Sequence, residues 1–187
     1  MGLRKTFAKI VIKVFGWHHE GQVPYDDKFV IIAMPHTSMM DFVMGLVTFW
    51  SKDIYPYVFI KKELFFFPMG LLLKALGARP LNRKGATGMI EQVLDCFNKE
   101  EKFCICITPE GTRKRTTKIK RGFYFIATQA NVPIYMGVLD YGKKSLSYGE
   151  RFVPTGDEEK DFEYIRKYYK AANPVARHPE QFCADFK

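Results

Sequence analysis

The chain has 187 residues, 47% of them hydrophobic and 16% aromatic, so it is long enough to bury a core and is expected to form one domain. The chain has 29 basic and 20 acidic residues, which gives a net charge of +9. This charge favours an anionic partner such as a lipid surface, an acidic carrier protein or nucleic acid. A soluble basic protein without such a partner is the alternative. Four cysteines without C-x-x-C spacing exclude a disulfide-rich scaffold and favour a reducing compartment with no metal site.

The N-terminal residues 1–20 are predicted to contain an amphipathic helix. Apolar residues recur there at helical spacing, and lysines line another face: Leu3, Phe7, Ile10, Val11 and Val14 against Lys5, Lys9 and Lys13. Such a helix could lie on an anionic lipid surface or pack on the domain's own core. The segment lacks the uninterrupted apolar region of a secretory signal, and no run in the sequence approaches the roughly 18–20 apolar residues of a spanning helix.

Further along the sequence, strand-like and helix-like runs alternate. Apolar and β-branched runs predict strands at 28–34, 54–60, 103–107 and 133–139, with an edge strand at 146–153, and helical spacing predicts helices at 39–51, 85–99, 121–130 and 157–170. The greasy segment 61–74 could line an acyl-chain groove or enter a lipid interface, but its pattern favours a core helix. The alternation predicts an α/β fold, a single domain with a mainly parallel or mixed β-sheet flanked by helices.

Two polar segments follow predicted strands. The first is Pro35-His36-Thr37-Ser38-Met39-Met40-Asp41, and the second is Thr108-Pro109-Glu110-Gly111-Thr112-Arg113. On one regular helix His36 and Asp41 would point about 140° apart, so they can meet only if His36 lies on a turn before the helix. Pro35 and a cap at Thr37 or Ser38 favour that turn. Histidine is the natural base near neutral pH, and a carboxylate can orient it.

These segments carry a resemblance. His36 to Asp41 resembles the H-x4-D motif of the glycerolipid acyltransferases, the lysophosphatidic-acid acyltransferase superfamily, and 109–113 matches that family's P-E-G-T-R motif. The stretch 77–83 resembles its second motif, and 132–134 its fourth. The four segments stand in family order, so the sequence is identified as resembling this superfamily over residues 36 to 134.

The resemblance implies a glycerol-3-phosphate acyltransferase-like fold at 21–187 and an O-acyltransferase that uses acyl-CoA or acyl-ACP. The expected acceptor is a lysophospholipid, with lysophosphatidic acid first, giving phosphatidic acid. Neither a metal nor a tightly bound cofactor is expected, because the thioester carries the activation. The resemblance further implies peripheral attachment at the cytoplasmic face of a membrane. The residue roles it implies are a base, His36, and its orienting partner, Asp41. Acceptor-binding residues are Glu110, Gly111, Thr112, Arg83 and Arg113, with the two arginines as phosphate ligands.

Other polar residues allow more than one interpretation. Ser38 lacks a G-x-S-x-G setting, so we interpret it as a helix cap rather than a covalent nucleophile. Six cations between 113 and 121 could bind phosphates or an acidic carrier protein, or could simply be solvated. His178 is expected to be an ordinary surface residue, and Arg79 has no assigned role.

Three other functions compete with this interpretation. An acyltransferase for another acceptor, such as an amino-acid lysolipid, fits the same motifs. A non-catalytic lipid- or membrane-binding protein of the same fold is also compatible with them, although the intact His36 and Asp41 argue against it. A nucleic-acid binder is disfavoured, because the basic run lacks interleaved aromatics and any recognisable nucleic-acid motif.

Overall fold

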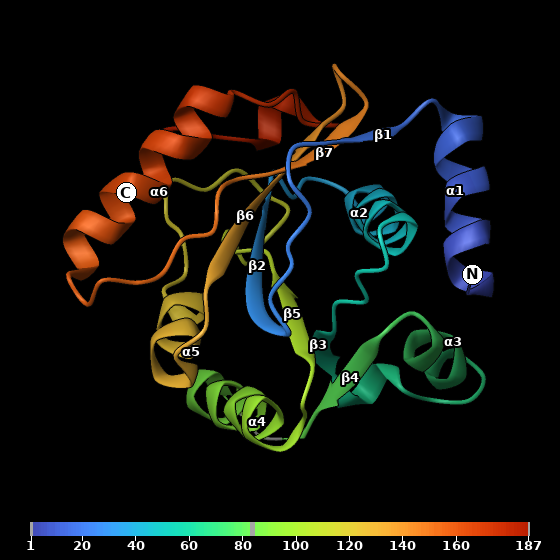
Figure 1. The fold of residues 1–187 in the computed structure, drawn as a ribbon, viewed down its shortest axis with the longest axis horizontal. Helices are drawn as coiled ribbons and strands as arrows, with labels where there is room; N and C mark the ends of the chain where they lie inside the picture. Colours follow the sequence, from blue (N-terminus) through green and yellow to red (C-terminus); the bar gives the residue numbers. More distant parts are fainter. Residues whose placement is uncertain (1, 83–84, 187) are drawn as a thin grey trace.

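A five-stranded mixed sheet forms the centre of the molecule in the computed structural model, which describes residues 2–82 and 85–186 (Figure 1). The strands are arranged in the order β1-β7-β6-β2-β5. They span His18–Glu20 (β1), Ser145–Tyr148 (β7), Ile134–Asp140 (β6), Lys28–Met34 (β2) and Phe103–Ile107 (β5). β2 runs parallel to both neighbours, β7 is antiparallel to β6, and β1 is parallel to β7. The predicted α/β class with a mixed sheet is confirmed.

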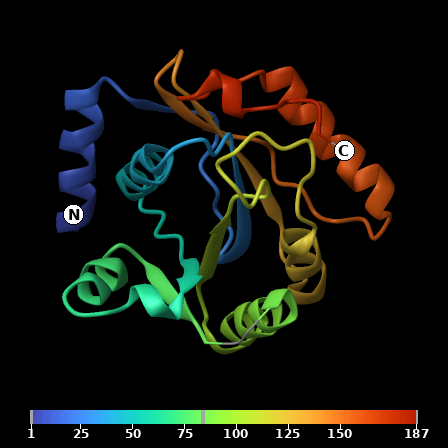
Figure 2. The same cartoon turned by 180° about the vertical axis from the view of Figure 1, so that it is seen from behind.

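Helices cover both faces of this sheet. One face packs against α4 (Gly85–Lys99), α5 (Gly122–Ala130) and α6 (Glu158–Ala172). The other packs against α2 (Met39–Ser51), and α1 (Leu3–Phe15) lies on the outer side of α2 (Figures 1 and 2). Successive side chains of β2 point to opposite faces, so Val30 and Ile32 enter the first core and Phe29 and Ile31 the second. Burial on both faces explains why β2 reads as a continuous apolar run.

The segment between α2 and α4, here called the excursion, leaves the main sheet and forms a separate two-stranded sheet. β3 (Val58–Lys61) and β4 (Ala78–Leu81) pair in parallel, and a 3-10 turn (Lys62–Leu64, η1) and a short helix, α3 (Met69–Ala75), connect them. The favoured core helix at 61–74 is wrong. The helix here, α3, begins only after Pro68 and has seven residues, and Leu71 and Leu72 are more than half exposed and Phe67 is 83% exposed.

Several predicted boundaries shift. The strand expected at 54–60 begins only at Val58 and joins the small sheet, and the expected edge strand at 146–153 is an inner strand, since β1 pairs outside β7. β1 and β4 were not predicted. A second 3-10 turn, η2 (Pro179–Gln181), follows α6 near the C-terminus.

The N-terminal helix α1 packs on the domain's own core and also exposes an apolar face, and its attachment to a lipid surface stays a prediction. It packs on α2 with Ala8, which is fully buried, and with Val11 and Ile12. Its outer face keeps large apolar side chains exposed: Leu3, Phe7, Ile10, Val14 and Phe15. Within the described part of the protein, no helix combines the length and apolar character needed to cross a membrane.

Candidate functional site

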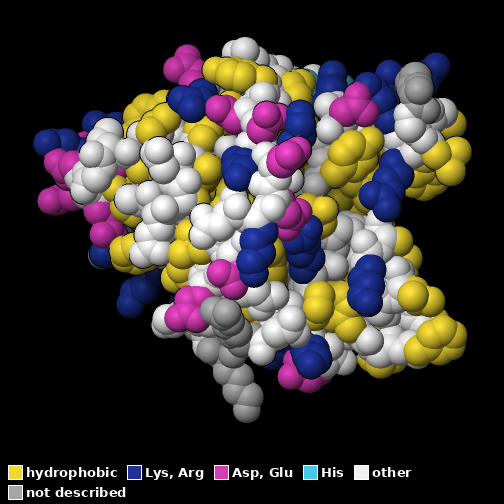
Figure 3. All heavy atoms as spheres, turned by 60° about the horizontal axis from the view of Figure 1, so that its bottom comes forward, with side chains coloured by type: hydrophobic (Ala, Val, Ile, Leu, Met, Phe, Trp, Pro, Cys, Tyr) yellow, Lys and Arg dark blue, Asp and Glu magenta, His cyan; other side chains and the backbone are white. Residues whose placement is uncertain are grey.

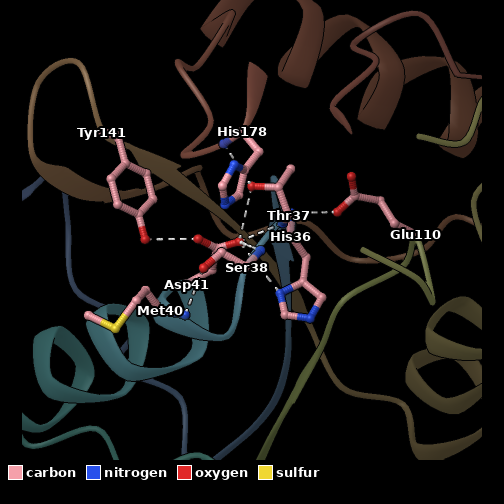
Figure 4. Close-up of polar contacts among 8 residues, drawn as sticks. All are labelled: His36, Thr37, Ser38, Met40, Asp41, Glu110, Tyr141 and His178. Atoms are coloured by element: carbon pink, nitrogen blue, oxygen red, sulfur yellow. Dashed lines mark hydrogen bonds and ion pairs between the residues drawn. The ribbon is translucent and has the colours of Figure 1, made fainter. Parts of the chain in front are cut away.

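The candidate site lies at the carboxyl ends of neighbouring strands, where ligands commonly bind in open α/β sheets. β2 ends at Met34 and leads into the turn that carries His36, and β5 ends at Ile107 and leads into the turn that carries Glu110. β6, on the other side of β2, ends at Asp140 and is followed by Tyr141. Figure 4 shows the side chains from these three strand ends together.

His36 and Asp41 face each other because His36 precedes α2. Ser38 is the N-cap of α2, and its hydroxyl accepts a hydrogen bond from the Met40 amide at 3.0 Å. Asp41 folds back over the helix start, and its Oδ2 accepts from the amides of Thr37 and Ser38 at 2.5 and 2.7 Å. This places His36 Nδ1 3.8 Å from Asp41 Oδ2. The turn before the helix and the capping role of Ser38 are as the sequence predicts.

The imidazole of His36 is set up to be neutral near pH 7. Burial lowers its pKa below the ordinary 6.5, since a low-dielectric setting disfavours the charged form. The carboxylate of Asp41 opposes this shift, and the guanidinium of Arg113 adds to it. A neutral imidazole whose Nδ1 faces a carboxylate leaves Nε2 to accept a proton from a substrate.

Glu110 holds the backbone of the histidine turn. Its side chain is 7% exposed, and Oε2 accepts a hydrogen bond from the His36 amide at 2.7 Å. Burial raises the pKa of Glu110 to about 8, and the nearby Asp41 charge acts in the same direction. Whether Glu110 also contacts an acceptor stays a prediction. Its observed partner is the protein's own backbone, which links the two motif turns.

The loop after Glu110 presents its charges outward. Gly111 has a φ of +64° and packs under Lys120, whose Cγ would lie 3.2 Å from an added Cβ, so this position favours glycine. The exposed hydroxyl of Thr112 accepts a hydrogen bond from the Lys114 amide at 3.1 Å. All six cations of the run are exposed: Arg113, Lys114, Arg115, Lys118, Lys120 and Arg121. Among them, Arg121 forms an ion pair with Glu158 at 2.8 Å.

The second motif, residues 77–83, contains two arginines, Arg79 and Arg83. Arg79 makes a bidentate pair with Glu100 at 2.5 and 2.9 Å and lies 3.6 Å above the ring centre of Tyr57, so its guanidinium is committed to internal contacts. The predicted phosphate ligand Arg83 falls outside the described residues. Its role stays a prediction.

Sequence reasoning missed two residues of the site. Tyr141 donates a hydrogen bond from its hydroxyl to Asp41 Oδ1 at 2.8 Å, and Gln181 reaches both motif turns from the C-terminal segment. Tyr141 directly follows a predicted strand, a position at the carboxyl edge that could have singled it out. His178, expected to be an ordinary surface residue, has a half-exposed ring, but its backbone amide donates to Thr37 Oγ1 at 3.3 Å.

The molecule also has an apolar groove away from the candidate site. An apolar groove of about 460 Å³ lies between α1 and the end of α2, lined by Leu3, Arg4, Thr6, Phe7, Ile10 and Trp50. It lies near the far end of α2, roughly 20 Å from the helix start that follows His36. Among residues 2–82 and 85–186, no three His, Cys, Asp or Glu side chains gather as a metal-binding group.

Three matches with known proteins bear on the family and the fold of this chain. A family model described as Acyltransferase matches residues 17–138. A Caenorhabditis elegans protein, acl-1, provisionally named a 1-acyl-sn-glycerol-3-phosphate acyltransferase, is 26% identical over 144 residues, covering 73% of this chain and 53% of the relative. The protein thus spans about half the length of that relative.

The third match is structural. The crystal structure of PlsC, the 1-acyl-sn-glycerophosphate (LPA) acyltransferase from Thermotoga maritima, has a TM-score of 0.61 and 20% identity, covering 88% of this chain and 74% of that one. At this level of identity, the likeness establishes a shared fold.

Proposed function

The chain belongs to the acyltransferase family, and from that premise we propose that it is an O-acyltransferase acting on a lysophospholipid. It moves a fatty acyl group from acyl-CoA or acyl-ACP to the acceptor, with lysophosphatidic acid the first candidate and phosphatidic acid the product. The observation that carries this proposal is the His36 imidazole, 3.8 Å from Asp41, with a lowered pKa. The name of the C. elegans relative agrees with the choice of acceptor.

In the proposed reaction His36 is the general base and Asp41 orients it. Nε2 of the imidazole takes the proton of the acceptor hydroxyl while the hydroxyl oxygen forms a bond to the thioester carbonyl carbon. The carbon–sulfur bond then breaks, and the leaving thiolate takes the proton back from the imidazolium. The 3.8 Å separation of Nδ1 and Oδ2 is longer than a hydrogen bond and would shorten once the imidazolium forms.

Arg113 and Arg83 are the proposed phosphate ligands. Arg113 is exposed at the mouth of the site and close enough to His36 to lower its pKa. A guanidinium fork suits a phosphate oxygen pair, so an acceptor phosphate bound there would hold its hydroxyl near the imidazole. Gly111 and Thr112 are proposed to shape the turn that presents Arg113, and Glu110 to hold the His36 backbone beside it.

Peripheral attachment to a membrane completes the proposal. Exposed apolar residues gather on α1 and on the excursion that carries α3, both on the same side of the molecule (Figures 1 and 3). Lysines and arginines lie beside these apolar side chains in Figure 3, as expected of a surface that enters an anionic lipid interface. A lipid acceptor would then reach the site without leaving the membrane.

The test is acyl transfer from a labelled thioester. Acyl-CoA and acyl-ACP are each combined with lysophosphatidic acid and with an amino-acid lysolipid, and His36→Ala serves as the catalytic control. His18→Ala is the histidine control, because its ring is half exposed on the edge strand β1 and has no role in the proposed proton transfer. We expect product with parental protein and His18→Ala, and a loss of at least about a hundredfold with His36→Ala, as for removal of a general base.

Different outcomes separate the competing functions. Transfer only to the amino-acid lysolipid would replace the acceptor and retain the mechanism. Full activity of a folded His36→Ala protein would refute the proposed base. Lipid binding without transfer from any donor would favour a non-catalytic member of the family.

A further inference from the structure

The segment that follows α6 crosses the candidate site. The His178 amide donates to the hydroxyl of Thr37 at 3.3 Å, and the Arg177 guanidinium lies 5.9 Å from the ring centre of Tyr141, whose own hydroxyl donates to Asp41. Each contact meets a residue of the histidine turn or one of its direct partners. Segment 177–181 is therefore a wall of the site, although the family model ends at residue 138.

Gln181 makes the contact that joins the two motif turns. With its amide nitrogen assigned to the side that faces two carbonyls, the side chain donates to Thr37 O at 3.1 Å and to Arg113 O at 2.6 Å. A primary amide has two N–H donors, so both bonds can form at once. Thr37 follows the candidate base directly, and Arg113 is the candidate phosphate ligand.

The segment that carries Gln181 is fixed on both sides. Before it, the Val175 carbonyl accepts from the Tyr141 amide at 2.8 Å, and Ala176 is buried. After it, Phe186 is 5% exposed and packs edge-on against Tyr169 at 6.2 Å between ring centres. Tyr169 is itself held to the sheet by hydrogen bonds to Ile32 O and Gly137 O. A donor on such a segment can hold its acceptors in place.

We propose that Gln181 is a positioning residue that sets the distance between the His36 turn and the Arg113 turn. This inference rests on the proposed function, since it assigns Gln181 to the recognition of the same phosphate-bearing acceptor. The residue touches neither reacting atom. It acts by holding the base and the phosphate ligand at the separation that the acceptor's hydroxyl and phosphate require, and displacements near 1 Å can reduce a rate by about a hundredfold.

Two variants distinguish donation from mere packing. Gln181→Ala removes both donors, whereas Gln181→Glu keeps the size and shape but points an acceptor, with negative charge, at two carbonyl oxygens. A residue that only fills space would tolerate glutamate better than alanine, and a bridging donor would tolerate it worse. Gln129→Ala is the control, because Gln129 is an exposed glutamine near the end of α5 and makes no contact proposed for the site.

The experiment measures kcat and KM for lysophosphatidic acid in all four proteins, together with NMR titration of the histidine rings. The protein has four histidines, and the His36 signal is identified by its absence from His36→Ala. The charged groups that act on His36 are Arg113, which lowers its pKa, and Asp41, which raises it, while Glu110 bonds the His36 backbone. If the Arg113 turn moves away in the Gln181 variants, the pKa of His36 should rise.

We expect kcat/KM to fall about tenfold in Gln181→Ala and further in Gln181→Glu, and to stay within about twofold in Gln129→Ala, with similar midpoints of thermal unfolding. Unchanged kcat/KM and an unmoved His36 titration in both Gln181 variants would overturn the proposal. So would glutamate outperforming alanine. Should the parental protein transfer no acyl group, a His36 pKa that rises only in the Gln181 variants would support the positioning role while the proposed reaction fails.

Discussion

Replacing Glu110 with glutamine should stabilise the protein at alkaline pH and change little at pH 5. Burial raises the pKa of Glu110 to about 8 in the folded protein, against an ordinary value of 4.5. Between these two values the folded protein holds a proton that the unfolded protein releases. The free energy of unfolding contributed by this group therefore falls as pH rises from about 4.5 to about 8.

The size of the effect follows from the separation of the two pKa values. Each pKa unit corresponds to about 1.4 kcal/mol, so the complete loss amounts to about 5 kcal/mol at pH 9. Glutamine resembles the protonated acid, and its carbonyl oxygen can accept the His36 amide as Glu110 Oε2 does at 2.7 Å. Because glutamine does not ionise, the variant should escape this loss. The advantage of Glu110→Gln should grow with pH up to that amount.

The assay is urea unfolding of both proteins at several pH values from 5 to 9. His36 contributes with the opposite sign: its folded pKa is lowered, so stability is lost as pH falls below 6.5. That contribution is present in both proteins and cancels in the difference between them. A difference in unfolding free energy that stays constant from pH 5 to 9 would refute the inference that the buried carboxyl is protonated in the folded state.

Two further predictions follow from the ends of helices. Ser38→Ala should lower the free energy of unfolding by about 1 kcal/mol, because the α2 cap is lost. The folded variant should retain acyl transfer. Abolished transfer would contradict the cap interpretation and favour Ser38 as a nucleophile. On α1, the double variant Leu3→Gln, Phe7→Gln should weaken flotation of the protein with anionic phosphatidylglycerol vesicles, because it removes two exposed apolar side chains. The control Val153→Gln, at another exposed apolar position, should not weaken it. Equal flotation of the two variants would show that α1 does not bind the lipid surface.

Much of the fold can be predicted because the pattern of each main element is local. The continuous apolar run 28–34 matches a strand buried on both faces, and the helical spacing at 85–99 matches α4 to the residue. The excursion was harder to predict. A run as apolar as 61–74 normally enters a core, but here it contributes exposed side chains such as Leu71 to the outer surface. Composition alone cannot distinguish a core helix from an apolar surface helix.

In the candidate site too, some residues could be predicted from the sequence and others could not. The turn at His36 and the cap at Ser38 are local features, so the residues between 35 and 41 predict them. Tyr141 and Gln181 reach the same turn from 100 and more residues away, and their contacts depend on the strand order and on the path of the C-terminal segment. Such contacts leave no periodicity or spacing in the sequence. Only the three-dimensional structure shows that they meet.

The spacing of five residues between His36 and Asp41 has a local physical cause. Ser38 is the N-cap and Asp41 the third helical residue, so the carboxylate of Asp41 turns back to accept the free amides of Thr37 and Ser38. A carboxylate in that position points away from the helix start, toward the preceding turn. The ring of His36 lies in that turn, next to the carboxylate. The same side chain thus caps the helix and faces the candidate base. The hydrogen bonds that stabilise the start of α2 also fix the direction of the carboxylate, so the geometry proposed for proton transfer forms as the helix forms, before any substrate binds.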